Sequence, residues 1–406
     1  MAIHVVGGVY WEYCVHPRWN EIYGSAGRAA LAIATMGTQA VLHSYMDQES
    51  QDVLAGKGVY LDAFEMRPTS VASSVRFRYL HDLATPVITG VPEPLYGVLD
   101  VHEKQVVRFG MLDGDARVHA EWAVYDPQNV SEGKPFRENG STAKHLALVL
   151  NSWEAAHMAG RPDAPAAEVA PILAAQQQAE VVIVKMGPQG AYVWTAAMQT
   201  QVPAYRTSRV WKVGSGDCFV AHFANAWMQE GRSAADAAAR ASLATAYYCE
   251  NMEFVTPEVL AGLQYPSVTP SAGYLRGEVR QVYLAGPFFD LSQVWMVEQA
   301  RTSLRDMGLK VFSPYHDIGL GSANDVVAKD LEALDESHIV FAITDGLDAG
   351  TVFEIGHARS RNIPVVVYSE RHHGGESLKM MEGTGCVLCS DYTTAIYSAL
   401  WEAVQI

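Results

Sequence analysis

Residues 339–358 read Ile339-Val-Phe-Ala-Ile-Thr-Asp345-Gly-Leu-Asp348-Ala-Gly350-Thr-Val-Phe-Glu354-Ile-Gly-His-Ala358. The opening run is short, β-branched and apolar and is followed by Asp-Gly, so it predicts a buried parallel strand that ends in a loop. Gly350 and Thr351 stand where the next helix would begin, and Glu354 falls about one turn inside it. This strand, loop and helix indicate an open α/β sheet.

Three carboxylates of this stretch, those of Asp345, Asp348 and Glu354, fall at or just beyond the loop. In an open α/β sheet, the loops beyond the carboxyl ends of the strands line the ligand crevice. Clustered carboxylates shift one another's proton affinities, which suits chemistry that needs one nucleophile and one acid, as glycosyl cleavage does. The alternative is structural, with Asp345 and Asp348 as turn and cap residues and Glu354 as a solvated helix residue.

From Gln281 to about Val367 the chain resembles the nucleoside 2-deoxyribosyltransferase family. The motifs that carry the resemblance are, in order, Tyr283-Leu-Ala-Gly286-Pro-Phe-Phe289, Phe312-Ser-Pro314, Asp330-Leu-Glu-Ala-Leu-Asp-Glu-Ser337 and the stretch from Asp348 to Ala358. The resemblance implies that Glu354 is the catalytic nucleophile, which attacks the anomeric carbon and forms a covalent glycosyl-enzyme.

The same resemblance implies roles for the other catalytic candidates. Asp348 would hold the Glu354 carboxylate or a sugar hydroxyl, Tyr283 would orient Glu354, and Asp330 would serve the departing base as acid or hydrogen-bond partner. No cofactor or metal is expected for this half. Asp317 is expected in a polar loop, and the general polarity of that loop explains an aspartate there as well as a ligand-binding role does. The predicted substrate-binding residues here are Gly286, Phe288, Asp317 and Gly350.

The bulk composition bounds the class of protein. The 406 residues are 49% hydrophobic and 18% charged, and the formal net charge is −16, which describes a globular chain long enough for two or three domains. The acidic balance and the lack of a dense Lys/Arg cluster argue against a nucleic-acid partner, whereas a small nucleoside or nucleotide fits because a local pocket can be positive. No 18-residue apolar run occurs, and the N-terminal residues are typical of a strand and a Gly turn. We therefore expect a cytoplasmic protein with no membrane partner.

Cysteine usage predicts neither a disulfide framework nor a metal site. The five cysteines are scattered and fit reduced thiols. Cys386-Val-Leu-Cys389 is a single pair in an apolar, strand-like segment, which argues against zinc or redox function. The polar, Gly-rich loop from His372 to Glu376 is expected at the rim of a site and not as a metal ligand set.

The first 265 residues show a second α/β pattern. Residues 1–45 predict strand, Gly-rich loop, helix and strand, and residues 71–117 hold short apolar runs that suit a small lid sheet. From Trp122 the α/β rhythm returns, with strands that end at Asp126, Asn151 and Lys185. We predict a domain over residues 1–265, a linker rich in Pro, Ser and Gly over 266–279, and a second domain over 280–406.

Gly214-Ser215-Gly216-Asp217 is a glycine loop that leads into an apolar helix expected over residues 218–229. Backbone N–H groups at such a loop and helix start form an anion site, and Asp217 could accept a hydroxyl proton in phosphoryl transfer. Asp is also a common N-cap, and taken alone the motif favours the capping interpretation.

Residues 1 to about 265 resemble the ribokinase-like (PfkB) carbohydrate and nucleoside kinase family. The resemblance implies that Asp217 is a catalytic base, that the N–H groups of Gly214, Ser215 and Gly216 form an anion hole, and that Asn151 and Glu154 support Mg²⁺ and phosphate. ATP and Mg²⁺ are therefore the expected cofactors of this half. The matching features are Gly7-Gly8, the Gly24–Gly37 helix, Asn151-Ser-Trp-Glu154, Lys185-Met-Gly-Pro-Gln-Gly190 and Gly214-Ser-Gly-Asp217.

The sequence departs from this family at the expected sugar pocket. Arg28 stands where the family usually has Asn, and Tyr10-Trp-Glu-Tyr13 stands where an acidic residue is usual. Trp211 and Lys212 replace the usual Asp-Thr before the glycine loop. Arg28 with the aromatic residues suits a phosphorylated or base-bearing ligand, and Arg28 is accordingly predicted to bind substrate. The alternative, which the sequence supports equally, is that the Arg28 side chain only packs and carries a surface charge.

Together these patterns predict two three-layer, Rossmann-like α/β domains, first a ribokinase-like domain with a small lid sheet and then a flavodoxin-like nucleoside deoxyribosyltransferase domain. The predicted function is cleavage or transfer at the N-glycosidic bond of a nucleoside or nucleotide, coupled to a kinase-like half that binds or phosphorylates a sugar or nucleoside. The sequence does not decide between hydrolase and transferase. In the alternative, the kinase-like half is an inactive sensor or scaffold that regulates a nucleotide-depleting glycosidase. A homo-oligomer is expected, by resemblance, because both families commonly assemble.

Overall fold

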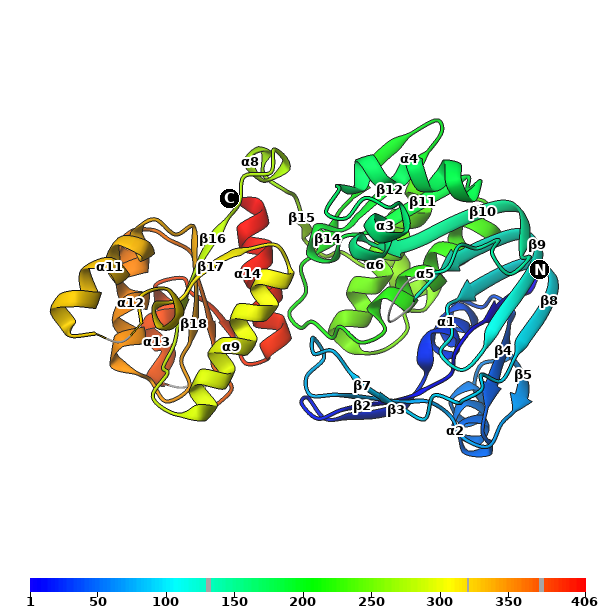
Figure 1. The fold of residues 1–406 in the computed structure, drawn as a ribbon, viewed down its shortest axis with the longest axis horizontal. Helices are drawn as coiled ribbons and strands as arrows, with labels where there is room; N and C mark the ends of the chain where they lie inside the picture. Colours follow the sequence, from blue (N-terminus) through cyan, green and yellow to red (C-terminus); the bar gives the residue numbers. More distant parts are fainter. Residues whose placement is uncertain (129–132, 320, 372–375) are drawn as a thin grey trace. The chain divides into compact units, whose positions relative to one another are not determined.

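The structure is a computed structural model that describes residues 1–128, 133–319, 321–371 and 376–406. The chain divides into two compact units, one formed by residues 1–207 with 211–267 and the other by residues 208–210 with 268–406. We call them the N-terminal unit and the C-terminal unit. Each has its own sheet and its own helices (Figure 1).

The N-terminal unit is built on a nine-stranded sheet. Its strands pair in parallel from β5 to β11, and the antiparallel strands β12 and β13 complete one edge. All residues of β1 are buried, as expected for a central parallel strand that is covered on both faces. In sheet order the strands are β13 (Gln199–Val202), β12 (Ala191–Thr195), β11 (Val181–Lys185), β10 (Thr142–Asn151), β9 (Asp115–Asp126), β8 (Val98–Phe109), β1 (Ile3–Val6), β4 (Ala40–Met46) and β5 (Phe64–Ser70).

Helices cover both faces of this sheet. One core packs α1, α5 and α6 against strand residues that include Val107, and a second core packs α3 and α4 against strand residues that include Val106. Adjacent residues of one strand enter opposite cores because successive side chains point to opposite faces. The helices are α1 (Gly24–Thr35), α2 (Gln48–Gly58), α3 (Ser152–Met158), α4 (Ala166–Gln177), α5 (Ser215–Ala224), α6 (Ala234–Asn251) and α7 (Pro257–Gly262), with a 3-10 turn at Gly187–Gln189 and a π-helical turn at Asn225–Gln229.

A small four-stranded sheet accompanies the large one, in the order β3 (Trp19–Ile22), β2 (Trp11–Cys14), β6 (Arg76–Tyr79) and β7 (Val87–Thr89). The predicted lid segment supplies β6 and β7, but its third strand, β8, joins the large sheet, where its last five residues are buried. Strands β2 and β3 are not predicted from the sequence. In β2 the buried side chains are those of Glu12 and Cys14, and Tyr13 is exposed, so burial does not follow hydrophobicity. The lid sheet therefore draws on two segments of the chain.

The C-terminal unit contains a five-stranded, fully parallel sheet. The predicted strand over 339–343 is its central strand, and all five residues are buried. The chain adds β17 on one side of β16 and β18 on the other, and open α/β sheets bind ligands at such a switch point. In sheet order the strands are β17 (Lys310–Phe312), β16 (Gln281–Ala285), β18 (Ile339–Ile343), β19 (Val365–Tyr368) and β20 (Val387–Cys389).

Helices α11 and α12 cover one face of this sheet and α9 and α14 the other (Figure 1). Two three-layer α/β units confirm the predicted fold class. No helix in the described part of the chain is long and apolar enough to cross a membrane. The helices are α9 (Leu291–Asp306), α10 (Pro314–Asp317), α11 (Ala323–Asp335), α12 (Ala349–Ser360), α13 (Lys379–Gly383), α14 (Tyr392–Gln405) and, inside the predicted linker, α8 (Ala272–Leu275), with a 3-10 turn at Glu376–Leu378; the two-residue strands are β14 (Ala204–Tyr205) and β15 (Ser267–Val268).

Candidate active site

Asp348 is the N-cap of α12 in the C-terminal unit. Its Oδ2 accepts a hydrogen bond from the Thr351 backbone N–H at 2.8 Å and another from the Thr351 hydroxyl at 3.0 Å. Such a cap satisfies a backbone donor that would otherwise have no partner and fixes the point at which the helix begins. The capping role considered for Asp348 is therefore real, and it sets the position of Glu354 further along the helix.

Tyr283 and Glu354 meet at the carboxyl side of the sheet. Tyr283 lies on β16, and its phenol donates a hydrogen bond of 2.6 Å to Oε1 of Glu354 on α12. The Tyr283 ring is buried and stacks on Phe312 from the neighbouring strand, with ring centroids 5.6 Å apart. The core on one face of the sheet thus holds the phenol in place, and the phenol holds one carboxylate oxygen.

The Glu354 carboxyl has an unusual proton affinity. Its pKa is raised to about 7, chiefly by burial and also by the charges of Asp330 and Asp348, whereas the hydrogen bond from Tyr283 lowers it. Burial and the charge of Glu354 also raise the pKa of Tyr283, so the proton of the pair stays on the phenol. The phenol therefore stays neutral beside a carboxyl group that is partly ionised at neutral pH.

Asp330 supplies a second carboxyl group to the same region from α11. Its charge acts on both Tyr283 and Glu354, and burial raises its own pKa. Its Oδ1 is buried and has no hydrogen-bond partner among the described residues. A buried polar atom without a partner is costly and is often completed by a ligand.

The predicted substrate-binding residues of this unit have local contacts. Phe288 stacks on Tyr315, with centroids 5.3 Å apart, and Asp317 accepts a hydrogen bond from the Ser313 backbone N–H at 2.8 Å. Gly286 is closely packed, since a Cβ there would lie 3.3 Å from Ile343. Gly350 is exposed, and a Cβ there would lie 3.1 Å from Oδ2 of Asp348. Only Gly350 lies directly beside one of the predicted catalytic carboxylates.

Asp345 does not join the Glu354 group. Its two carboxylate oxygens accept hydrogen bonds from the backbone N–H groups of Glu370 at 3.2 Å and Arg371 at 2.9 Å. This carboxylate ties together the loops that follow β18 and β19, so the turn role considered for Asp345 is the one observed. His372 and His373 lie outside the described residues.

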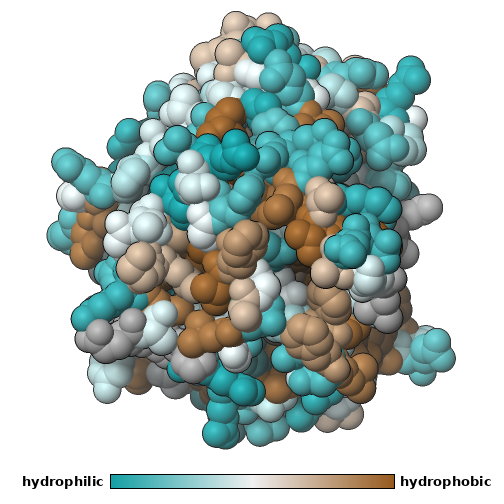
Figure 2. Space-filling view, turned by 90° about the vertical axis from the view of Figure 1, so that its left-hand side faces the viewer, coloured by the Kyte–Doolittle hydropathy of each residue, from teal (hydrophilic) through white to brown (hydrophobic). Residues whose placement is uncertain are grey.

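The C-terminal unit exposes apolar side chains close in sequence to these catalytic candidates. On the face drawn in Figure 2, hydrophobic residues gather near the middle and hydrophilic residues surround them. Phe353, beside Glu354, is 60% exposed, and Phe289 is 74% exposed. Exposed apolar side chains and partly buried carboxylates are therefore both available to a ligand that has a flat ring and a sugar.

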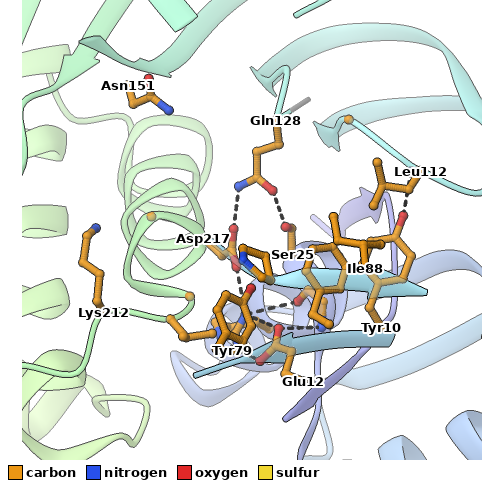
Figure 3. Close-up of a pocket in the computed structure, with 18 of the residues that line it drawn as sticks. Tyr10, Glu12, Ser25, Tyr79, Ile88, Leu112, Gln128, Asn151, Lys212 and Asp217 are labelled. Carbon is orange, nitrogen blue, oxygen red and sulfur yellow. Dashed lines mark hydrogen bonds and ion pairs between the residues drawn. The ribbon is translucent and has the colours of Figure 1, made fainter. Parts of the chain in front are cut away.

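The N-terminal unit holds a cavity of about 550 Å³ between the small sheet and the ends of the large-sheet strands (Figure 3). One wall is largely apolar and includes Phe77, Tyr79 and Ile88 from the small sheet, and the other is polar and includes Asp217 and Lys212. The predicted residues Arg28, Asn151, Glu154, Gly214, Gly216 and Asp217 all line this cavity. Ser215 is buried at the start of α5.

Asp217 is not the N-cap of α5. The cap is Gly214, whose φ of +79° lies in the left-handed region that favours glycine, and it makes no side-chain cap bond. The capping interpretation of Asp217 is therefore wrong. The Asp217 carboxylate accepts hydrogen bonds instead from Arg28 at 2.8 Å and from the Gln128 amide at 2.6 Å.

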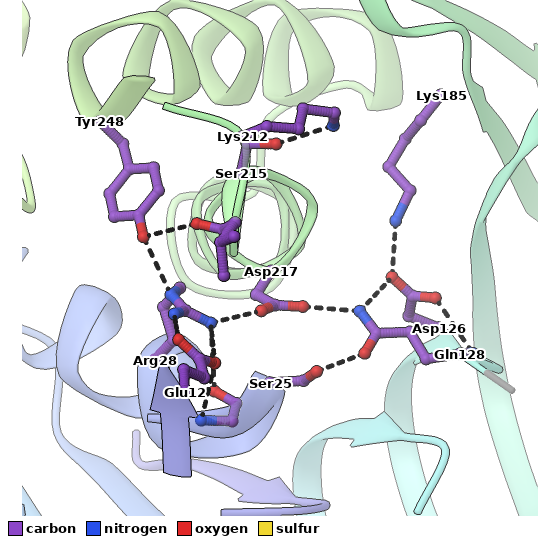
Figure 4. A network of polar contacts seen from close by, with 12 residues as sticks. Glu12, Ser25, Arg28, Asp126, Gln128, Lys185, Lys212, Ser215, Asp217 and Tyr248 are labelled. Atoms are coloured by element: carbon purple, nitrogen blue, oxygen red, sulfur yellow. Dashed lines mark hydrogen bonds and ion pairs between the residues drawn. The ribbon is translucent and has the colours of Figure 1, made fainter. Parts of the chain in front are cut away.

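Arg28 is buried at the centre of a polar network (Figure 4). Both oxygens of Glu12 and one of Asp217 accept from its guanidinium, and its Nε donates to Tyr248 at 3.1 Å. Burial alone would lower the pKa of Arg28, but the charges of Glu12, Tyr248 and Asp217 raise it well above the ordinary value. The surface-charge interpretation of Arg28 is wrong, because the side chain is 1% exposed. A Cβ at Gly214 would lie 2.1 Å from the guanidinium carbon.

Asn151 and Glu154 form a capping box at the start of α3. The Asn151 side chain accepts from the Glu154 N–H, and the Glu154 side chain accepts from the Asn151 N–H, both at 2.8 Å. Burial raises the pKa of Glu154 to about 7, and the charge of Asp126 adds to this shift. Asp126 is itself paired with Lys185 at 2.6 Å. These carboxylates are thus close enough to interact, but each already has a local partner.

Sequence reasoning misses Glu12 and Gln128 as members of this site. Glu12 appears in the sequence only as one of four residues in an aromatic stretch, and its role depends on its closeness to Arg28. Gln128 follows the end of β9. Its position just after a parallel strand is the sequence feature that could have pointed to a place in the site. Its amide links Asp217 to Ser25 (Figure 4).

Two family models match the chain, one in each unit. The nucleoside 2-deoxyribosyltransferase model matches residues 282–383, which contain Tyr283, Asp330, Asp348 and Glu354. The pfkB family carbohydrate kinase model matches residues 141–257, which contain Asn151, Glu154 and Asp217. The chain joins a pfkB-family domain to a nucleoside 2-deoxyribosyltransferase-family domain. Each candidate site lies in its own matched domain, apart from the cavity residues that precede residue 141.

Solved structures that resemble the chain are ribokinase-family kinases. Ribokinase from Thermotoga maritima is 14% identical with a TM-score of 0.46, and the match covers 65% of this chain and 96% of the ribokinase chain. Phosphofructokinase-2 from Escherichia coli in complex with potassium is 14% identical with a TM-score of 0.47, and the match covers 64% of this chain and 98% of the phosphofructokinase chain. The Methanocaldococcus jannaschii nucleoside kinase is 13% identical with a TM-score of 0.48 and covers 64% and 96%. A comparison with curated proteins found no match.

Kinases of the pfkB family use ATP with a metal ion. The pfkB-family cavity fits an anionic ligand, because Gly214, Gly216 and the Lys212 side chain line it at the start of α5. Glu154 and Asn151 offer the oxygen ligands that Mg²⁺ prefers, and Glu154, with its raised pKa, would become ionised beside a cation. The described residues contain no cluster of three or more His, Cys, Asp or Glu side chains arranged to hold a metal without the help of a ligand.

Proposed function

We propose that the C-terminal domain cleaves or exchanges the N-glycosidic bond of a nucleoside or nucleotide, with Glu354 as the nucleophile. The observation that carries the proposal is the 2.6 Å hydrogen bond from Tyr283 to Glu354, together with a buried Asp330 oxygen that has no hydrogen-bond partner among the described residues. A carboxylate held by a neutral donor, and a second carboxyl group with an open hydrogen-bonding position, are the two parts that a retaining glycosyl transfer needs.

The reaction has two displacements. In the first, a Glu354 oxygen forms a bond to the anomeric carbon, the bond from that carbon to the base nitrogen breaks, and its electron pair leaves with the base. Asp330 donates its proton to the departing base. In the second, water or another base attacks the anomeric carbon and gives its proton to Asp330, and the ester bond to Glu354 breaks. Water makes the enzyme an N-glycosidase, and a second base makes it a transferase.

The protonation states of the three groups suit these roles. Burial raises the pKa of Asp330, which is the direction that a general acid needs. A Glu354 pKa of about 7 leaves a substantial ionised fraction at neutral pH, and the positive charge that develops on the sugar favours the ionised form. Tyr283 orients Glu354 and does not itself lose a proton.

Asp348 and Phe288 are proposed to position the substrate. The cap bonds to Thr351 both use Oδ2 of Asp348, and Oδ1, which has no partner among the described residues, is proposed to accept from a sugar hydroxyl. Gly350 keeps the approach to this carboxylate free of a side chain. The Phe288 and Tyr315 rings suit stacking on a base.

The N-terminal domain is proposed to bind or phosphorylate a sugar or nucleoside, with ATP as the phosphoryl donor when it is bound. A second candidate function is that this domain is an inactive sensor or scaffold that regulates a nucleotide-depleting glycosidase. The contact between Arg28 and Asp217 favours the second candidate, because the predicted base already has a charged partner. A cytoplasmic homo-oligomer is proposed from the family resemblances.

The test of the C-terminal activity is base release. The purified chain is incubated with a panel of nucleosides and nucleotides, and free base is measured by chromatography, with and without a second base as acceptor. Wild-type protein and the Glu336→Gln control, which changes an exposed residue just after α11, should release base, whereas Glu354→Ala should not. Equal release by Glu354→Ala would contradict the proposal.

A further inference from the structure

In the N-terminal cavity, side chains of the protein itself already engage both oxygens of Asp217. Oδ2 accepts from Arg28 at 2.8 Å, and Oδ1 accepts from Gln128 at 2.6 Å. A general base has to approach the hydroxyl that it deprotonates to within roughly 2.6–3.2 Å. Because a carboxylate oxygen can accept more than one hydrogen bond, an acceptor hydroxyl would have to share an oxygen with one of these two donors or displace it.

Arg28 is held too firmly to be displaced by a neutral hydroxyl. Glu12 accepts from both terminal nitrogens of Arg28, and Tyr248 accepts from Nε and donates to the Val213 carbonyl at 2.9 Å. All members of the network are buried. Moving the guanidinium away would leave Glu12 as a buried carboxylate without its cation, which is strongly unfavourable.

The glycine loop is shaped around this guanidinium. Gly214 adopts φ +79°, and a Cβ there would lie 2.1 Å from both Nε and Cζ of Arg28. Gly214 therefore lies directly against the Arg28 side chain, with no room for a Cβ between them. The loop that would face a reacting group instead packs on the cation that neutralises Asp217.

The cavity nevertheless keeps one cation for a ligand. Arg28 is paired with Glu12 and Asp217, and Lys185 is paired with Asp126. The Lys212 ammonium donates to the Ser215 hydroxyl at 2.9 Å and forms no ion pair with a carboxylate in the described part of the chain. Burial lowers the pKa of Lys212, and a bound anion would oppose that shift. Lys212 lines the polar wall, across the cavity from the aromatic wall.

We propose that the N-terminal cavity binds a phosphate-bearing ligand with a flat ring through Lys212, and that it does not phosphorylate an acceptor, because the Asp217 carboxylate, which would act as the base, stays paired with the buried Arg28. Arg28 is then the residue that turns a kinase-like cavity into a binding site. The ligand's phosphate lies at Lys212 and the start of α5, and its ring lies against Phe77 and Tyr79.

The first test is binding to the full-length chain, measured by titration calorimetry with ADP, AMP and ribose. ADP and AMP should bind and ribose should not. Lys212→Met should weaken ADP binding at least tenfold. Lys144→Met, the control on an exposed lysine of β10, should change ADP binding less than twofold. Circular dichroism checks that both variants are folded. Equal binding by Lys212→Met and wild type, or no ADP binding by wild type, overturns the proposal.

The second test needs only a comparison of turnover. Wild type and Asp217→Asn are incubated with ATP, Mg²⁺ and a panel of nucleosides and sugars, and ADP is measured. The two proteins should form ADP at the same background rate with every acceptor. Acceptor-dependent ADP formation by wild type that Asp217→Asn abolishes would show that Arg28 does not block the base. Base release, which depends on Glu354, is measured on the same samples, so a failure of either proposal is seen separately.

Discussion

The phenol of Tyr283 donates a 2.6 Å hydrogen bond to Glu354, although the two residues are 71 positions apart in the chain. One comes from strand β16 and the other from the helix that follows β18, the neighbouring strand. The contact brings the first and last motifs of the C-terminal domain together at the switch point of its sheet. It fixes one oxygen of Glu354 and leaves the other for a reacting atom.

Replacement of Tyr283 by Phe tests what this hydrogen bond contributes. The ring and its stacking on Phe312 remain, but Glu354 loses its donor. A hydrogen bond to a charged group contributes roughly 1.5–3 kcal/mol, so kcat for base release should fall about 10- to 100-fold with little change in KM. The hydrogen bond lowers the Glu354 pKa, so the acidic limb of the pH profile should move to higher pH. An unmoved limb would mean that Tyr283 serves packing alone.

The pH dependence of base release reports on Glu354. The nucleophile has to be ionised, and burial raises its pKa to about 7. The rate constant kcat/KM should therefore rise tenfold per pH unit below about 7, and it should fall again at higher pH as Asp330 loses the proton that the departing base needs. A profile that is already flat between pH 5 and 7 would show that a carboxyl of ordinary pKa, or none, controls the reaction.

Asp330 is tested by its amide variant. Asp330→Asn keeps the size of the side chain but has no carboxylic proton for the departing base. Loss of a general acid costs roughly 10²- to 10⁴-fold, and the loss should be smaller for substrates whose base leaves readily without protonation. Glu332→Gln, an exposed change on the same helix, should retain full activity. Uniform loss across good and poor leaving groups would point to a positioning role.

The stability of the fold should also respond to Glu354. Its pKa in the folded state is raised from 4.5 to about 7, so the stabilising contribution of this group is present below about pH 4.5 and is lost as the pH rises through 7. Glu354→Gln resembles the protonated form. Its Tm should equal that of wild type near pH 4.5 and exceed it at pH 8, by roughly 2–4 °C if about 1 kcal/mol is involved. A variant less stable than wild type at pH 8 would contradict the burial of the charge.

Much of the C-terminal site follows from sequence because each part is local. The apolar run Ile339–Ile343 can only be a short buried strand, and Asp348 lies at the right distance before Glu354 to cap the next helix. What the pattern cannot give is the partner of each carboxylate. Asp345 looks equivalent to Asp348 in the sequence, yet its oxygens are taken by backbone N–H groups beyond β19.

The N-terminal network shows the opposite case. The contacts between Arg28, Glu12 and Asp217 join three segments distant in sequence, and the pairing of buried charges is decided by tertiary packing. A sequence shows that Arg28 departs from a family pattern but not that it is 1% exposed. The same reasoning explains why Asp217 was open to a capping interpretation that Gly214 excludes.

The most direct test of the central claim is a mass measurement on the enzyme itself. The full-length protein is mixed with a substrate nucleoside, quenched in acid within the first turnover, digested and mapped by mass spectrometry. We predict a sugar adduct on the peptide that contains Glu354, which is absent in Glu354→Gln and disappears when a second base or time for hydrolysis is allowed. Base release with no adduct on that peptide, or with an adduct on another residue, would contradict the account.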